Sequence, residues 1–182
     1  MKFPLSPLFA ACALTMAVSS AYAADAMPAM APAEGAAAEA KALILLKPDD
    51  AEFKPVPGAA PCNTMANLRG DLSKGPATFT SKLTPGCIAP WHWHTPTEEV
   101  IVLKGTAVMQ MKGEAAITLP TGSYSQLPSK HWHRFRCTKD GDCIVLVIAD
   151  GLFDIHFVDK NGKEISAEKA QRLAEKEGTK GW

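Results

Sequence analysis

The sequence predicts an all-β domain of the jelly-roll or barrel type, and two observations support this fold class. From about residue 60 onward, short apolar segments of alternating polarity are separated by turns that contain glycine or proline. No long helical period interrupts this series. Many short strands with such turns are typical of jelly rolls and barrels, in which each strand turns one face toward the core. One β domain without a solenoid repeat is therefore expected.

The expected strands can be placed in order along the chain. The apolar run 42–46 suits an edge or arm strand, and the prolines after it keep the chain extended. Further strands are expected at 64–68, 77–83, 98–103, 106–111, 115–119, 123–127, 132–137, 144–148 and 153–158. One helix near the end has Ser166 as its N-cap and Gly178 as its stop signal, and it is expected to pack outside the barrel.

Four side chains that can bind a metal occur at a spacing that would bring them together. Because side chains in a strand alternate between faces, the two histidines of the Trp-His-Trp-His segment point the same way. The short turn 95–97 then lets a carboxylate return beside them, and a further histidine lies downstream. Neutral imidazoles with one carboxylate suit a divalent transition metal. The predicted ligands are His92, His94, Glu98 and His133.

This pattern resembles the two sequence motifs of the cupin superfamily. The first motif is matched without a gap by Gly86, His92, His94, Glu98 and Gly105, and the second is matched by Gly122, Pro128 and His133. The resemblance implies a double-stranded β-helix, the cupin jelly-roll barrel, with an N-terminal arm and a short C-terminal helix. It also implies a three-histidine, one-glutamate metal centre and a homodimer. Two positions depart from the family pattern: Lys130 replaces a usual glycine and Cys137 replaces a frequent asparagine.

The metal and the chemistry are less closely defined by the sequence. One ion per chain is expected, with Fe, Mn, Ni and Cu all compatible and Zn as a further alternative. Four protein ligands around an octahedral ion leave about two positions for water, dioxygen or a substrate oxygen. His131 shares strand parity with His133 and is the candidate catalytic residue, as a proton carrier or substrate contact. Glu99 has the opposite parity to the ligands and is expected to be a solvated charge.

Three classes of function follow from such a centre. The first is a metal-dependent enzyme, of oxidase or dioxygenase type, that acts on a small organic molecule. An isomerase or decarboxylase is the alternative within this class, but it needs a general base, and few candidates are present near the ligands. The second class is a non-catalytic periplasmic cupin that binds a metal or small ligand. The third, a purely structural metal, ranks last because structural sites are normally closed.

The N-terminal segment predicts export. Lys2 precedes an apolar run at 8–18, and Ala-Tyr-Ala at 21–23 is a small-x-small cleavage site, so residues 1–23 are expected to be a signal peptide. That run is too short to span a membrane. An Ala- and Pro-rich linker is expected at 24–41, the barrel at 42–160, and a helix and tail at 161–182. A periplasmic or secreted location follows.

The charge balance argues against a nucleic-acid partner. Nineteen basic residues face nineteen acidic ones, so the chain presents no excess of positive charge to a phosphate backbone. The partner expected from the sequence is a small-molecule ligand or substrate.

Cysteine usage fits an oxidising compartment. Four cysteines remain after the predicted cleavage: Cys62, Cys87, Cys137 and Cys143. A three-residue hairpin loop at 139–141 would place Cys137 opposite Cys143, which predicts a disulfide across the hairpin. The alternative is that Cys137, on the face of His133, brings a sulfur near the metal. A bond between Cys62 and Cys87 is the other expected pairing, although connectivity cannot be fixed from sequence.

Overall fold

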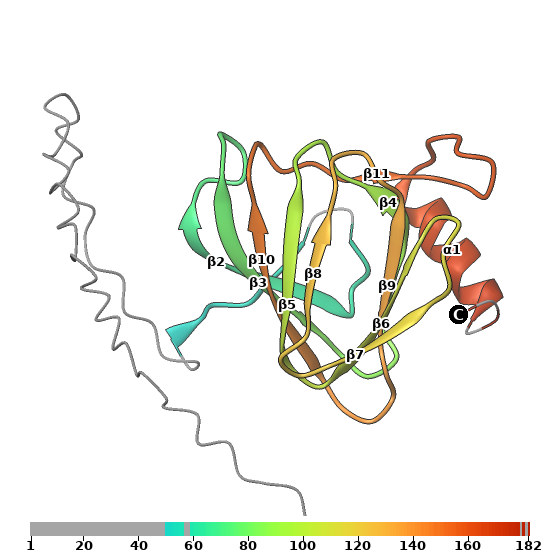
Figure 1. Ribbon diagram of the computed structural model, residues 1–182, viewed down its shortest axis with the longest axis horizontal. Helices are drawn as coiled ribbons and strands as arrows, with labels where there is room; N and C mark the ends of the chain where they lie inside the picture. The colour runs from blue at the N-terminus through green and yellow to red at the C-terminus, as the bar shows by residue number, and fades with distance from the viewer. Residues whose placement is uncertain (1–49, 57–58, 179, 181) are drawn as a thin grey trace, which may run out of the picture. The chain divides into compact units, whose positions relative to one another are not determined.

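Two antiparallel sheets face each other and form a jelly roll (Figure 1). The computed structural model describes residues 50–56, 59–178, 180 and 182. The predicted signal peptide, the linker and the strand at 42–46 lie outside the described residues. Among the described residues, no helix is long and apolar enough to cross a membrane.

Within the described part of the chain, the first sheet has six strands and the second has five, and all neighbours pair antiparallel. The first has the order β1 (Lys54–Pro55), β2 (Asn63–Gly70), β3 (Ala77–Leu83), β10 (Cys143–Ala149), β5 (Glu98–Lys104) and β8 (Tyr124–Leu127). The second has the order β11 (His156–Phe157), β4 (Ile88–Trp93), β9 (His133–Cys137), β6 (Thr106–Met111) and β7 (Ile117–Pro120). The predicted all-β fold class is confirmed.

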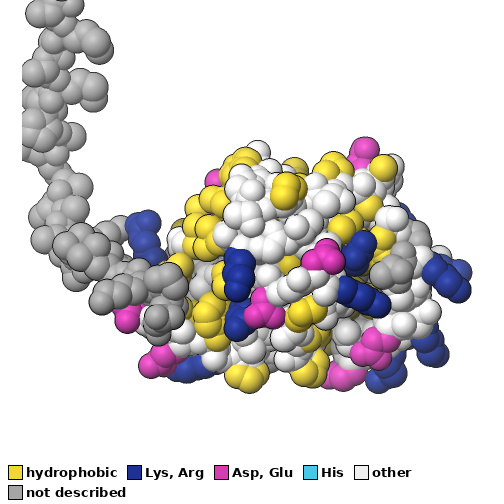
Figure 2. Space-filling view, turned by 90° about the horizontal axis from the view of Figure 1, so that it is seen from below, with side chains coloured by type: hydrophobic (Ala, Val, Ile, Leu, Met, Phe, Trp, Pro, Cys, Tyr) yellow, Lys and Arg dark blue, Asp and Glu magenta, His cyan; other side chains and the backbone are white. Residues whose placement is uncertain are grey.

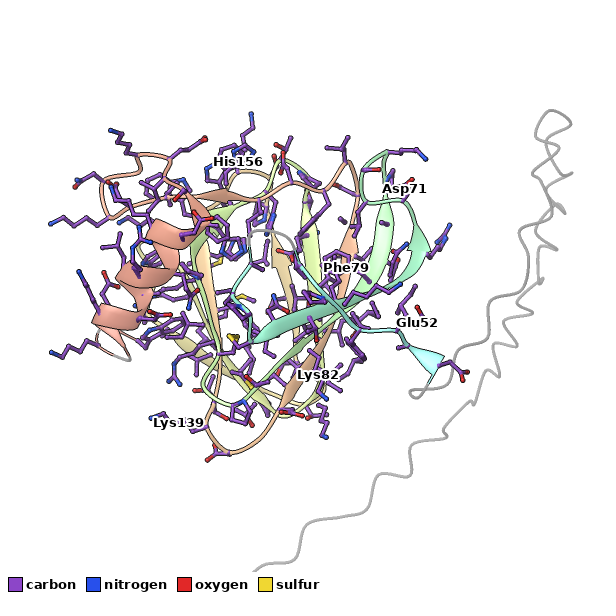
Figure 3. All side chains as sticks on the ribbon, turned by 180° about the vertical axis from the view of Figure 1, so that it is seen from behind. Glu52, Asp71, Phe79, Lys82, Lys139 and His156 are labelled. Atoms are coloured by element: carbon purple, nitrogen blue, oxygen red, sulfur yellow. A yellow bond between two sulfur atoms is a disulfide. The ribbon has the colours of Figure 1, made fainter. Side chains whose placement is uncertain are left out.

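The core lies between the two sheets, and strand alternation explains its composition. Phe79, Val147 and Val100 are direct neighbours across β3, β10 and β5, and all three are buried. Met109 and Phe135 form the corresponding pair on β6 and β9 of the other sheet. Figure 3 shows Phe79 inside the barrel. The inward residues of both sheets therefore share one apolar interior, as a period of two requires.

The segment 153–158 forms much less strand than the sequence predicts. Only His156 and Phe157 pair with β4, and Val158 adds a single bridge to Glu164. The physical reason is that residues before them bond to loops instead of a neighbouring strand. The backbone N–H of Phe153 donates to the carbonyl of Leu72 at 3.1 Å. This segment is therefore an irregular strap that contacts the loop at Leu72, His94 and the end of β4 in turn.

Helix α1 (Ala167–Glu177) packs on the outer side of the barrel beside β4 (Figure 1). Ser166 caps its start by accepting from the N–H of Lys169, and Gly178 ends it with φ +56°, as predicted. The helix end is fixed by Arg134, whose guanidinium lies 4.9 Å from the Trp91 ring and 4.1 Å from the Trp182 ring.

The surface carries no large region of one charge on the face shown in Figure 2, where basic and acidic side chains are interspersed. This agrees with the balanced composition of nineteen basic and nineteen acidic residues.

Two disulfides close the part of the barrel that lies away from β11. Cys137 is bonded to Cys143 across the β9–β10 hairpin, whose tip carries Lys139 at the opposite end from His156 (Figure 3). The hairpin disulfide is therefore confirmed, and the alternative that Cys137 brings a sulfur to the metal is wrong, because its Sγ is already bonded. Cys62 is bonded to Cys87, which joins the start of β2 to the segment before β4.

The two disulfides should stabilise the fold unequally, because they close loops of different length. Their sequence separations are 25 for Cys62–Cys87 and 6 for Cys137–Cys143. Loop-closure entropy then gives about 3.5 kcal/mol for the first and about 2.4 kcal/mol for the second. Paired Cys→Ala variants, unfolded in urea, should show the larger loss of unfolding free energy for the Cys62/Cys87 pair. A larger loss for the hairpin pair would contradict the entropic account.

Candidate metal centre

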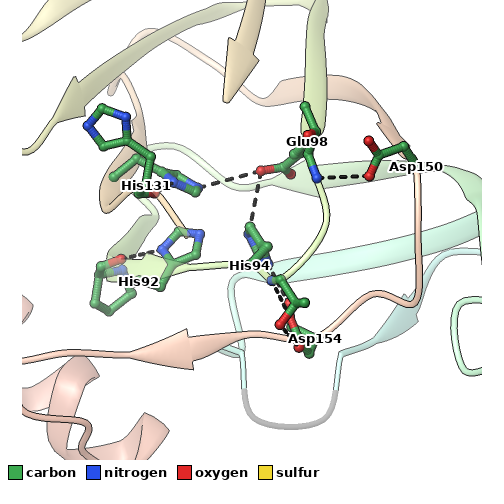
Figure 4. A network of polar contacts seen from close by, with 10 residues as sticks. His92, His94, Glu98, His131, Asp150 and Asp154 are labelled. Carbon is green, nitrogen blue, oxygen red and sulfur yellow. Dashed lines mark hydrogen bonds and ion pairs between the residues drawn. The ribbon is translucent and has the colours of Figure 1, made fainter. Parts of the chain in front are cut away.

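The four predicted ligands meet at one end of the barrel and come from both sheets. His92 lies near the end of β4 and pairs directly with His133 of β9. His94 follows β4, and Glu98 is the first residue of β5 after the turn at 95–97. All four are buried, with exposed fractions of 3–7 %. Close pairing of β4 with β9 therefore supplies two histidines, and the turn brings the carboxylate to them (Figure 4).

Each of the three imidazoles is held by one backbone carbonyl. The Nδ1 atom of His92 lies 2.6 Å from the carbonyl of Pro90, and that of His133 lies 3.0 Å from the carbonyl of His131. The Nδ1 atom of His94 contacts the carbonyl of Asp154. A carbonyl only accepts, so each Nδ1 carries the proton and donates it. Each Nε2 is then left with its lone pair available for a metal.

The ring nitrogens converge. One from each of His92, His94 and His133 lies within 4.8 Å of the other two. The Oε2 atom of Glu98 lies 3.4 Å from Nε2 of His94 and 3.5 Å from Nε2 of His133. This oxygen is buried and accepts no hydrogen bond from any described residue. A buried carboxylate oxygen without a partner is unfavourable, and a cation between it and the three nitrogens would satisfy it.

The protonation states suit a metal. Burial, with the neighbouring His133 and His94, holds the pKa of His92 well below its usual value. Burial likewise lowers the pKa of His94. For Glu98, burial by itself raises the pKa, but the facing His94 and His133 outweigh it and the net shift is downward. Neutral imidazoles and an ionised carboxylate are the forms that bind a divalent ion.

A second layer of side chains fixes His94. The ring of Phe153 stacks on the His94 imidazole with centroids 4.6 Å apart. The Asp154 carboxylate accepts from the backbone N–H of Thr95 at 2.7 Å and from its hydroxyl at 2.5 Å. These hydrogen bonds lower the pKa of Asp154, against the opposing effect of its burial. Sequence reasoning missed Phe153 and Asp154, because they lie about sixty residues from His94 and belong to no motif.

The centre opens into a cavity of about 110 Å³ between the sheets. Its wall is mainly apolar and includes Phe79, Val100, Phe135 and Val147. Among the described residues that line it, the ionisable side chains are the four candidate ligands alone.

A family model for the cupin domain matches residues 79–149, which contain all four candidate ligands and most strands of both sheets. Residues 79–149 are therefore similar to a cupin domain, and the two-sheet jelly roll that contains them has the cupin fold. The match begins at β3 and ends at β10.

Solved structures share the cupin fold at low sequence identity. The polyketide cyclase RemF from Streptomyces resistomycificus is 20% identical, with a TM-score of 0.56 over 66% of this chain and 89% of that chain. An RmlC-like cupin protein from Ralstonia eutropha JMP134 is 18% identical, with a TM-score of 0.55 over 76% and 90%. A cupin-like protein of unknown function from the same organism is 19% identical, with a TM-score of 0.54 over 75% and 85%. Identities this low show the fold alone. No curated protein matches significantly.

The second cupin motif adapts to the lysine that replaces its usual glycine. Lys130 has φ +59°, in the left-handed region that glycine favours. Its backbone N–H donates to the carbonyl of His94 at 2.8 Å, and the hydroxyl of Ser129 donates to the carbonyl of Thr95 at 2.6 Å. The left-handed residue thus lets the 128–131 loop bind the loop that carries His94.

His131 lies apart from the other predicted site residues. Its side chain is exposed and does not line the cavity, and only its carbonyl reaches the centre, as the acceptor for His133. Strand parity places it with His133, but β9 begins only at His133, so alternation does not extend back to residue 131. Glu99, which has the opposite parity to Glu98, is half-buried on the other face of β5.

Replacing Lys130 by glycine should stabilise this protein. A non-glycine residue in the left-handed region costs roughly 1–2 kcal/mol, and glycine loses roughly 0.5–1 kcal/mol more chain entropy on folding. Lys130→Gly should therefore raise the unfolding free energy by roughly 0.5–1 kcal/mol, measured by urea denaturation. Lys130→Ala removes the same charge but keeps the strain, and it should leave the stability within roughly 0.5 kcal/mol of the original. Equal stability of the two variants would argue against strain at this position.

Proposed function

We propose that this protein is a metal-dependent enzyme of oxidase or dioxygenase type that acts on a small organic molecule held in the barrel cavity. One divalent transition metal per chain, from the set Fe, Mn, Ni and Cu with Zn as a further candidate, would be held by His92, His94, Glu98 and His133. The observation that carries the proposal is the convergence of three nitrogens with free lone pairs and one unpartnered carboxylate oxygen on an apolar cavity.

The chain's own residues define what the site can do. A redox-active ion would supply electron transfer between dioxygen and a chelated substrate oxygen. His92, His94, Glu98 and His133 would hold the ion, and a six-coordinate ion held by four side chains could bind about two further oxygens. The apolar wall would exclude bulk water and strengthen electrostatic interactions at the centre.

The lining of the cavity argues against proton-transfer chemistry. An isomerase or decarboxylase needs a general acid or base within hydrogen-bond reach of the substrate. The ionisable side chains that line the described cavity are all candidate ligands, and the exposed His131 side chain lies outside it. The proposal therefore gives His131 no contact with substrate.

A second candidate function is a cupin that binds a metal or small ligand without turnover. The same lack of an acid or base favours it, because binding needs neither. Elemental analysis and electron paramagnetic resonance of the purified protein, under nitrogen and then air, separate the two. A redox-active ion near one per chain, with a spectrum that responds to dioxygen or to enolisable compounds, supports the enzyme. Zinc, or an ion whose spectrum ignores every added compound, supports the binding protein.

Substitution of a ligand should remove the metal. In His94→Ala or His133→Ala, one nitrogen is lost from the cluster and Glu98 loses a neighbour 3.4–3.5 Å away. Metal content per chain, measured by mass spectrometry of the dialysed protein, should fall by at least tenfold.

His131→Ala is the matched control, because it removes an imidazole two residues from His133 but outside the cluster, and the carbonyl that accepts from His133 remains. Its metal content should equal that of the original protein. Full occupancy in His94→Ala would overturn the ligand set, and loss of turnover with retained metal in His131→Ala would restore His131 as a catalytic candidate.

The proposed enzyme is an exported homodimer. The two disulfides support export, since such bonds persist in oxidising compartments. The outer face of the first sheet carries the exposed Leu103 and Tyr124 on the neighbouring strands β5 and β8, which suits a dimer contact. Light scattering of the purified protein tests the dimer.

Export predicts a defined mature N-terminus. If residues 1–23 are a signal peptide, the protein recovered from the periplasm or medium begins at Ala24. Intact mass spectrometry measures this directly, and the same measurement should show a mass 4 Da higher after full reduction of the two disulfides, with about one hydrogen gained per sulfur. An intact Met1 in the exported protein would contradict the assignment.

A further inference from the structure

A groove on the surface lies beside the metal end of the second sheet. Met111 of β6 pairs with His133 of β9, and Lys112 and Trp132 are the next residues beyond this pair. The backbone N–H of Lys112 donates to the carbonyl of Trp132 at 2.9 Å, which keeps the two residues side by side. Together with the loop 128–131 they border a groove of about 500 Å³. None of these residues lines the cavity at the candidate metal centre, so the groove is a separate concavity.

The ionisable side chains of the groove are all basic. Within the described chain it is lined by Lys112, Pro128, Ser129, Lys130, His131 and Trp132. Neither lysine forms an ion pair with a described residue, and Glu114, the acid nearest to Lys112 in the sequence, does not line the groove. The chain as a whole has equal numbers of basic and acidic residues. The groove is therefore a local concentration of positive charge that attracts an anion.

Lys130 lies in the groove at a conformational cost. Its φ of +59° is in the left-handed region, where side chains other than glycine are strained. The contact of this residue with the His94 loop uses only its backbone N–H, which glycine would also supply. Strained backbone of this kind is found preferentially at functional sites. Since the backbone needs no side chain here, the strain indicates a role for the lysine side chain itself.

Trp132 forms an aromatic wall of the groove that is already fixed in place. Its ring packs so closely on Gly162 that a side chain at residue 162 would overlap it. The Lys112 ammonium lies 5.6 Å from the centre of the Trp132 ring and 5.9 Å from that of Trp91. Both contacts are within the range of cation–π interactions. The groove thus presents an ordered indole and a held cation to a ligand.

Few neutral hydrogen-bonding groups remain for a ligand in the groove. The Ser129 hydroxyl donates to the carbonyl of Thr95 at 2.6 Å. Pro128 has no N–H, and its carbonyl accepts from the N–H of His131 at 3.1 Å. The hydroxyls of a sugar ring would find few partners here, whereas an aromatic ring needs none. A volume of about 500 Å³ lies within the usual size range of small-molecule sites and fits two fused rings.

We infer that this groove binds a free aromatic carboxylate of one or two rings. The carboxylate is bound by Lys130 and Lys112, with the His131 imidazole as a further hydrogen-bonding group. The ring contacts Trp132 and Pro128. The site lies outside the barrel cavity and does not rest on the proposed function.

Three probe molecules test the chemistry of the ligand. 2-Naphthoate carries the ring and the charge, 2-naphthamide has the same ring without the charge, and D-galacturonate is a carboxylate on a sugar ring. Binding is measured by two-dimensional NMR of the isotope-labelled protein with zinc, a diamagnetic ion. We expect 2-naphthoate to shift the backbone amide signals of Lys130, His131 and Trp132, with a dissociation constant on the order of 0.1–1 mM. The other two probes should bind at least about threefold more weakly.

Substitutions at Lys130 separate its charge from its backbone strain. Lys130→Ala keeps the left-handed strain and removes the ammonium, so it should weaken 2-naphthoate binding by about threefold to fivefold. Lys130→Arg restores the charge and should restore the affinity. Lys130→Gly should bind as weakly as Lys130→Ala although it is the more stable protein. The matched control is Lys104→Ala, which removes an exposed lysine of β5 outside the groove and should leave the affinity unchanged.

Several results would overturn the inference. Equal binding of 2-naphthamide would remove the role of charge, and tighter binding of D-galacturonate would replace the ligand class by acidic sugars. Shifts of Phe79 and Val147 in place of the groove signals would put the ligand in the barrel cavity. Undiminished binding in both Lys130→Ala and Lys130→Gly would show that Lys130 does not hold the ligand. The metal content of the protein does not enter any of these outcomes.

Discussion

The three hydrogen bonds from Nδ1 of the histidines to backbone carbonyls are the interaction on which the site depends. They fix the tautomer and the ring plane of each imidazole, so that the three Nε2 atoms converge. For His92 and His133 the acceptor is the carbonyl two residues earlier in the same chain segment, Pro90 and His131. These two ligands are thus oriented by local backbone geometry as soon as β4 and β9 pair.

The third ligand depends on the whole fold. His94 is oriented by the carbonyl of Asp154, sixty residues later, on the irregular strap. Asp154 is itself held by Thr95, and Phe153 stacks on the imidazole. A change that loosens residues 153–154 therefore reaches His94 directly, and farther along the strap Phe157 pairs with His92. The same contacts explain why this segment forms so little strand, since its polar groups are already engaged by the 94–97 loop.

The parts of the site that follow a local period could be predicted from the sequence, and the parts made by distant loops could not. Alternation along β4 and the short turn before Glu98 are local, and they bring these ligands to one end of the barrel as expected. Strand alternation does not extend to His131, because this residue precedes β9 and its ring is exposed, and its catalytic role stays a prediction. The Cys62–Cys87 disulfide, which the even number of cysteines led us to expect, is present. The roles of Asp154 and Phe153 depend on tertiary contacts, for which a single sequence carries no periodic signal. At Lys130 the cupin pattern implies glycine. The backbone adopts the left-handed conformation that glycine favours even though the residue is lysine, which the sequence alone did not predict.

The barrel interior contains both a buried polar cluster, which lowers the stability of the fold, and an apolar core, which raises it. Burial of Glu98 and three histidines costs stability, since each polar group loses water and Glu98 Oε2 gains no hydrogen bond. Apolar side chains at these positions would carry no such desolvation cost. The inner surface of β3, β10 and β5 has apolar residues of this kind, namely Phe79, Val147 and Val100. The cost is concentrated at one end, and a bound cation would offset it there by pairing the carboxylate and the free nitrogens at once. Binding of a metal would therefore couple to folding through Glu98, while the two disulfides near the other end of the barrel hold the scaffold around the site.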